Sequence, residues 1–124
     1  MSATLLLVAL GGALGAVARY LTGLAALRLI GPGFPWGTLA VNVAGSFAMG
    51  LLAVTLAHWG QTRLAPLLMT GFLGGFTTFS AFSLDALTLW ERGDALLAAA
   101  YVAASVILSL AAIFAGLTLA RSLT

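Results

Sequence analysis

Residues 71–83 read GFLGGFTTFSAFS, and this stretch decides how the middle of the chain folds. It lies within the apolar run 65–90, yet its glycines are followed closely by Thr77 and Thr78, which makes a group of weak helix formers. We therefore predict a helix that breaks midway. Backbone freed by a break is tolerated in hydrocarbon only where protein or a cavity satisfies it, so carbonyls near the break need a cation or a facing helix.

The rest of the chain is almost entirely apolar. Of the 124 residues, 62% are hydrophobic and only 6% are charged, about a quarter of the charge of a soluble domain. So few charges cannot cover a globular surface, and the solvent is therefore lipid.

Four stretches are long enough to cross a membrane. Crossing ~30 Å of hydrocarbon takes about 20 helical residues, and the stretches are 3–27, 38–57, 65–90 and 95–120. The links between them are short, so successive helices are expected to be antiparallel. The sequence predicts an all-α integral membrane protein, a single domain of four transmembrane helices with the third broken at mid-membrane.

Several classes of function lack the residues they need. The basic residues are spread along the chain and form no patch for a phosphate backbone, which argues against nucleic acid as a partner. There is no cysteine and only one histidine, which argues against a thiolate or zinc site. No carboxylate pair, nucleophile with a base, or phosphate loop is visible, so we expect no enzyme.

The basic residues of the links do not set an orientation. With a cytoplasmic N-terminus, Arg63 and Arg121 lie inside, whereas Arg28 and Arg92 lie outside. Two interpretations stay open. Either the N-terminal amine or the insertion machinery decides, or the chain inserts both ways and forms an antiparallel homodimer with its two-fold axis in the membrane plane.

Two polar residues within the first two spans are candidates for function. Arg19 lies on one helical face with Gly12 and Gly15, and a guanidinium within a span costs about 2.5–3.5 kcal/mol unless it snorkels or faces water. At a water-filled entrance it would attract anions, whereas Gly11 and Gly15, in GxxxG spacing, by themselves favour close helix packing. Asn42, with Ser46 one turn beyond, suits either an interhelical hydrogen bond or donation to an anion.

Aromatic and hydroxyl side chains follow the expected break. Phenylalanines mostly pack, but the positive ring edges of Phe79 and Phe82 could also coordinate an anion that has shed its water. The third and fourth spans add hydroxyls that could form a wall of donors, although serine in a helix often bonds back to its own backbone. These residues are Ser80, Ser83, Tyr101, Ser105 and Ser109.

Three segments resemble, in order, the motifs of the Fluc-type (CrcB-like) fluoride channels. They are GGALGAVARY at 11–20, GTLAVNVAGSFAMG at 37–50 and GFLGGFTTFSAFS at 71–83, and the resemblance covers essentially the whole chain. It implies a fluoride-selective channel that exports fluoride passively across a bacterial plasma or inner membrane. It also implies an antiparallel dual-topology homodimer with two pores and a structural sodium ion at its centre.

The resemblance further implies roles for single residues. Arg19 matches the vestibule arginine, Asn42 the pathway asparagine, and Phe79 and Phe82 the rings that line the pores. The backbone carbonyls of Gly74 and Thr77 match the sodium ligands, and the five hydroxyl residues of the third and fourth spans match the polar track. The chain departs from the family pattern in two places, because Ala81 stands where threonine is usual and Asp85 where glutamate is common.

Two other classes remain open. A small multidrug transporter of dual topology has a similar length and span count, but it receives a cationic substrate on an acidic residue in the first span, where this chain has Arg19. A purely structural membrane subunit would need neither the polar residues at mid-membrane depth nor a broken third span.

Overall fold

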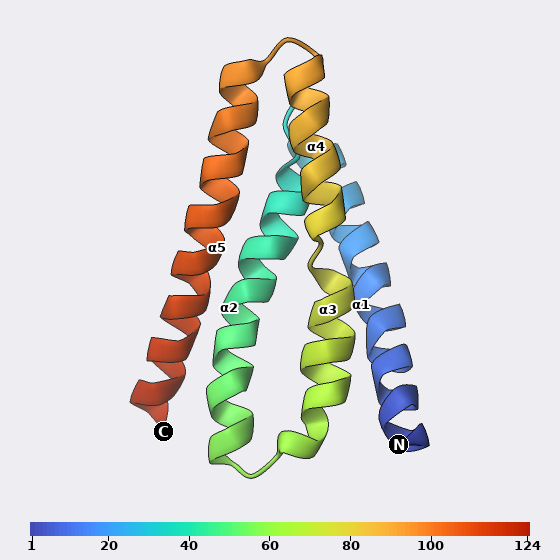
Figure 1. The fold of residues 1–124 in the computed structure, drawn as a ribbon, viewed down its shortest axis with the longest axis vertical. Coiled ribbons are helices and arrows are strands. Elements are labelled where there is room, and N and C mark those ends of the chain that lie inside the picture. The colour runs from blue at the N-terminus through green and yellow to red at the C-terminus, as the bar shows by residue number, and fades with distance from the viewer.

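The computed structural model describes all 124 residues and contains helices and short links but no strand. The elements are α1 (Ser2–Leu29), α2 (Trp36–His58), the 3₁₀ turn η1 (Thr62–Leu64), the π-helix η2 (Pro66–Leu73), α3 (Gly74–Phe76), α4 (Phe79–Glu91) and α5 (Ala95–Leu123). The chain crosses the molecule four times in alternating directions, so both termini lie at the same end (Figure 1). Four helical segments are long and apolar enough to span a membrane. The expectation of an all-helical chain with four such spans is confirmed.

The link between α1 and α2 reverses the chain within six residues. Gly31 and Gly33 have φ angles of +105° and +108°, a backbone conformation that residues with a Cβ rarely adopt. Pro35 then stands at the N-cap of α2. Glycine and proline at these positions therefore end the first helix and set the direction of the second.

α1 packs backbone to backbone against η2. A Cβ on Gly11 would lie 2.2 Å from the carbonyl oxygen of Leu67, and one on Gly15 would lie 2.0 Å from that of Phe72. Only glycine fits at either position, so the close packing predicted for the first-span glycines is confirmed. The π-helical form of η2 was not predicted, because its wider turn has no clear signature in the sequence.

A second glycine contact joins α2 to α5. A Cβ on Gly50 would lie 2.4 Å from the carbonyl oxygen of Ile113, and one on Gly116 would lie 2.3 Å from that of Phe47. This contact is not among those predicted from the sequence. The chain thus contains two tightly packed helix pairs, α1 with the lower half of the third span (η2 and α3) and α2 with α5 (Figure 1).

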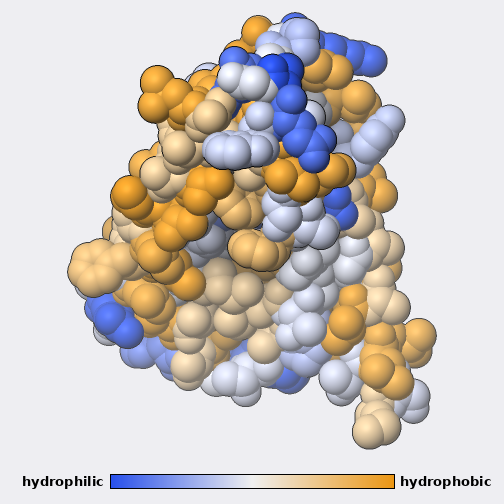
Figure 2. Space-filling view, turned by 45° about the horizontal axis from the view of Figure 1, so that its top comes forward, coloured by the Kyte–Doolittle hydropathy of each residue, from blue (hydrophilic) through white to orange (hydrophobic).

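The outer surface is that of a protein in lipid. Only 16 of the 124 residues are buried, and large apolar side chains such as Leu6, Leu14 and Phe114 are more than half exposed. Figure 2 shows apolar side chains over much of the surface, with hydrophilic residues gathered toward its upper and lower margins. In water such a surface would drive aggregation, whereas a bilayer solvates it.

Candidate functional site

The third span is interrupted at Thr77 and Thr78. α3 ends at Phe76, and the two threonines have extended backbone. Thr77 has φ −85° and ψ 158°, and Thr78 has φ −154° and ψ 121°. Thr78 also caps α4, because its Oγ1 accepts a hydrogen bond from the amide of Ala81 at 3.1 Å. The break therefore lies within the segment where the sequence predicts it.

Asn42 of α2 holds the break in place. Its Nδ2 donates to the carbonyl oxygen of Thr78 at 3.0 Å, and its Oδ1 accepts from the amide of Thr78 at 2.7 Å. The side chain replaces the two backbone partners that the interruption removes. The interhelical role predicted for Asn42 is thus present, and one Nδ2 hydrogen remains to donate elsewhere.

Two backbone carbonyls at the break lose the donors that a continuous helix would give them. An α-helix directs the amide of residue i+4 at the carbonyl of residue i, but the amide of Thr78 goes to Asn42 and that of Ala81 goes to Thr78 Oγ1. The oxygens of Gly74 and Thr77 are thereby released. Gly74 lies on the surface of the molecule.

Arg19 meets the break from the opposite side. Its Nε donates to the carbonyl oxygen of Gly75 at 3.0 Å in a half-buried position, so a charged donor satisfies another carbonyl near the end of α3. The other guanidinium nitrogens make no hydrogen bond within the chain. Arg19 thus lies against the break on the α1 side.

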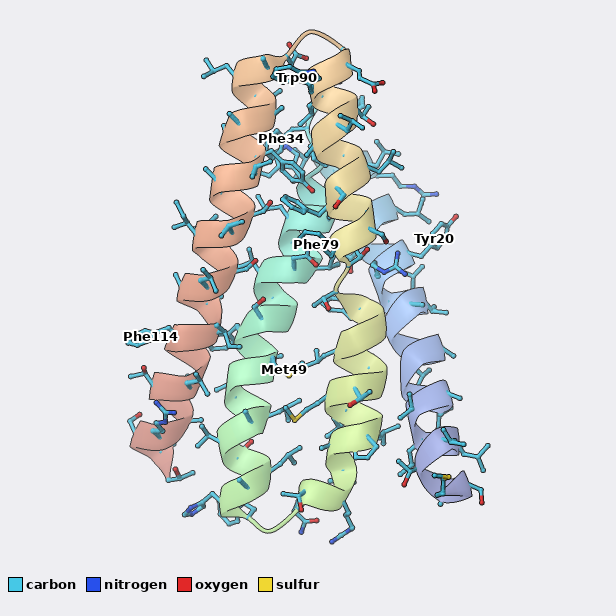
Figure 3. All side chains as sticks on the ribbon, viewed as in Figure 1. Tyr20, Phe34, Met49, Phe79, Trp90 and Phe114 are labelled. Atoms are coloured by element: carbon cyan, nitrogen blue, oxygen red, sulfur yellow. The ribbon has the colours of Figure 1, made fainter.

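A cavity of about 380 Å³ lies on the other side of the break. Two of its lining residues are labelled in Figure 3, Phe79 near the break and Met49 between α2 and the lower half of the third span. Its walls come from α2, the break, the start of α4 and α5, and include no charged side chain. The lining residues are Asn42, Gly45, Ser46, Met49, Thr77, Thr78, Phe79, Phe82, Ser105, Val106, Ser109, Leu110 and Ile113.

The two candidate rings line this cavity in different environments. Phe79 is 78% exposed, whereas Phe82 is 8% exposed and packs against Tyr101 at a centroid distance of 5.3 Å. The centroids of Phe79 and Phe82 are 5.5 Å apart with the ring planes at 47°. Phe82 therefore both packs and borders the cavity, while Phe79 projects from the surface of the molecule next to the break.

Several hydroxyls within the spans bond to their own backbone. Bonds to the carbonyl four residues earlier are made by Thr22, Thr55, Thr77, Ser83, Thr88 and Thr118. Ser46, Ser105 and Ser109 make no such bond, and all three line the cavity. The Oγ of Ser105, on a residue only 5% exposed, has no partner in the chain. These three free hydroxyls thus lie where a ligand could use them.

Three predicted hydroxyl residues lie outside the cavity. Ser80 pairs with Thr78 through their hydroxyls at 3.2 Å, and Ser83 donates to the carbonyl of Phe79 at 2.9 Å. Tyr101 is fully buried, and its phenol donates to Asp85 Oδ2 at 3.2 Å. The structure therefore separates the candidates into a cavity group and a group around it.

Ser46 also lines the cavity, although it is not among the site residues predicted from the sequence. It follows Asn42 by one helical turn, so the spacing alone places both on one face of α2. Met49 and Ile113 carry no polar group, and nothing in the sequence marks them as cavity residues. The contact of Asp85 with Tyr101 joins α4 to α5 and could not be read from local spacing.

Comparison with known proteins covers nearly the whole chain. A family model described as "CrcB-like protein, Camphor Resistance (CrcB)" matches residues 6–117. A protein of Cereibacter sphaeroides named fluoride-specific ion channel FluC is 67% identical over 121 residues, which is 98% of this chain and 97% of that protein. A protein of the same name from Paracoccus denitrificans is 63% identical over 123 residues, which is 99% of this chain and 98% of that protein. Another from Rhizobium etli is 62% identical over 120 residues, which is 95% of this chain and 96% of that protein.

Proposed function

This chain belongs to the CrcB-like family, and from that premise we propose that it is a fluoride-selective ion channel. It is an integral multi-pass membrane protein, with four segments long and apolar enough to span a bilayer. In this role it lets fluoride leave the cell passively, down its electrochemical gradient. The curated relatives named as fluoride-specific channels, which match along almost their full length, support this proposal.

The lining of the cavity beside the break is the observation that supports a fluoride pathway. Its polar groups are hydroxyls and an amide, and no acidic side chain lines it to repel an anion. Fluoride that sheds water needs donors in exchange, while a pore wide enough to keep its hydration shell would also pass chloride. Asn42, Ser105 and Ser109 offer conventional donors, and the edges of Phe79 and Phe82 add weak ones that let the ion leave.

Arg19 and the remaining hydroxyls have supporting roles in this proposal. Arg19 is the cation that attracts fluoride toward the break, using the guanidinium nitrogens that do not bind Gly75. Ser80, Ser83 and Tyr101 extend the track of hydroxyls beyond the cavity, although Ser83 and Tyr101 already donate to Phe79 and Asp85. Their contribution therefore requires a change of partner when the ion passes.

The proposal includes an antiparallel homodimer with two pores. Phe79 is 78% exposed at mid-membrane depth beside a cavity that one subunit leaves open, so a second copy would complete the wall. The four arginines outside Arg19 divide two and two between the ends of the subunit, which favours insertion in both orientations. Cysteine labelling from the two sides of the membrane tests this, because a single orientation would contradict it.

A structural sodium ion at the dimer centre completes the proposal. The carbonyls of Gly74 and Thr77 fit such an ion, because they are oxygen ligands whose helical donors are engaged with Asn42 and Thr78. A cation there would offset the negative end of the interrupted helix in each subunit. A high-resolution dimer structure without ion density between the two breaks would contradict this part of the proposal.

Fluoride efflux from liposomes tests the function directly. We expect liposomes that carry the purified chain to release trapped fluoride quickly once an ionophore lets a counter-ion cross and removes the membrane potential. The same liposomes should retain chloride under the same conditions. Empty liposomes are the control. Equal release of both anions would contradict selectivity, and fluoride release no faster than from empty liposomes would contradict the channel itself.

A further inference from the structure

A row of aromatic rings leads from the link between α1 and α2 to the cavity. Phe34 meets Tyr101 edge to face at a centroid distance of 5.4 Å, and Tyr101 meets Phe82 at 5.3 Å. Phe82 in turn meets Phe79 at 5.5 Å. Figure 3 labels Phe34 near the upper parts of α4 and α5, well above Phe79 at the break. The link therefore reaches the pore rings through side chains.

The two links at this end of the molecule are tied together. Nη2 of Arg92, in the link between α4 and α5, donates to the carbonyl oxygen of Gly33 at 2.9 Å. Nε of the same side chain pairs with Asp94 Oδ2 at 2.7 Å, which fixes the guanidinium. Because Gly33 immediately precedes Phe34, this bond holds the backbone from which the ring extends.

We propose that Phe34 is a positioning residue for the pore ring of Phe82, acting through Tyr101 and held in place by Arg92. This inference rests on the proposed function. Tyr101 is fully buried between the rings of Phe34 and Phe82, and Phe82 is 8% exposed. Neither ring can tilt far while Phe34 closes the upper side of the cluster, so Phe34 sets which edge of Phe82 faces the cavity.

The competing interpretation is that Phe34 only fills the core. It packs against the buried cluster that contains Leu39, Leu89 and Ala98 as well as Tyr101, so its loss lowers stability on either interpretation. A core-filling role predicts fewer folded molecules, each with normal flux. A positioning role predicts folded molecules in which each conducts less.

Phe34→Leu in reconstituted protein separates these two roles. Leucine keeps the apolar bulk but removes the ring, and we expect fluoride flux per folded protein to fall about fivefold. Phe34→Tyr keeps the ring and should return flux to within about twofold of the wild-type value. The matched control is Phe114→Leu, which makes the same change at a ring 69% exposed on α5, with no aromatic partner, and should leave flux unchanged.

A double-variant cycle with Phe82→Ile tests the route. If Phe34 acts through Phe82, the combined variant should conduct no less than Phe82→Ile alone, because the ring that Phe34 positions is already gone. Multiplied losses would overturn the proposal, as would wild-type flux per folded protein in Phe34→Leu. If Phe34→Leu does not fold, Arg92→Gln releases the link from its outer side, and an unchanged flux there would overturn the proposal. Absence of flux from the wild-type chain would instead overturn the proposed function.

Discussion

The two halves of the third span are built by different means. The lower half, Pro66–Phe76, packs chiefly on α1 through glycines, and its backbone touches the backbone of its neighbour. The upper half, Phe79–Glu91, packs chiefly on α5 through side chains, with Phe82 and Leu89 in a buried cluster. The position of the lower half therefore depends on glycines that let two backbones touch. The position of the upper half depends on how its side chains pack. The break falls where the chain passes from one neighbour to the other.

This contrast predicts that the closest contacts between α1 and the lower half tolerate no added carbon. Gly15→Ala would place a Cβ 2.0 Å from the carbonyl oxygen of Phe72, and neither backbone can move without separating the helices. We expect a loss of about 3 kcal/mol or more and little protein that elutes as a single species in detergent. Gly23→Ala is the matched control on α1, because its Cβ would meet nothing within 4 Å. Normal yield and thermal stability of Gly15→Ala would contradict the backbone contact.

The joint between the halves should be the next most sensitive point. Asn42→Ala removes both hydrogen bonds to Thr78 and leaves an amide and a carbonyl unpaired at mid-membrane depth. We expect a cost of about 2 kcal/mol, measured as a lower thermal midpoint in detergent. Ser46→Ala, one turn away on the same face, makes no bond within the chain and should leave that midpoint nearly unchanged. Equal midpoints for the two variants would mean that the break does not depend on Asn42.

In the upper half, ring chemistry should matter more than bulk. Phe79→Ile and Phe82→Ile keep apolar volume but remove the positive ring edge, and fluoride flux per folded protein should fall at least about tenfold, or ~1.4 kcal/mol of barrier. Methionine should be less harmful at both positions because its thioether is polarizable and flexible.

The exposures of the two rings separate packing from conduction. Phe82 is 8% exposed, so its substitution should also lower the thermal stability of the protein. Phe79 is 78% exposed, so its substitution should lower mainly the fluoride flux. Liposome flux and thermal midpoints measured on the same preparations check both expectations. Wild-type flux in both isoleucine variants would return the rings to a packing role.

Much of the fold could be predicted because hydrophobicity is a local property. The number of spans follows from apolar length, and the break follows from glycines and threonines adjacent in the chain. The packing of Gly11 and Gly15 was also predictable from their spacing. The π-helix and the contact of Gly50 with α5 were not, because both depend on how a neighbouring helix fits.

The candidate site was predicted less completely than the fold. Asn42, Phe79, Phe82, Ser105 and Ser109 line one cavity, as their residue types suggest for an anion pathway. Other candidates, such as Ser80 and Ser83, carry equally suitable groups but lie outside this cavity. Their hydroxyls look alike in the sequence, and only the three-dimensional arrangement shows which face the cavity.

By itself, the sequence determined the solvent, the number of crossings, the place of the break and the chemical types available at mid-membrane depth. Each of these depends on residues close together in the chain, where steric preference and hydropathy act directly. The tertiary structure decided which partner each polar group takes. Asn42 binds a threonine 36 residues away, and Arg19 binds a carbonyl 56 residues away. Such choices follow from helix packing, because a buried polar group must pair with whatever donor or acceptor the fold brings within reach.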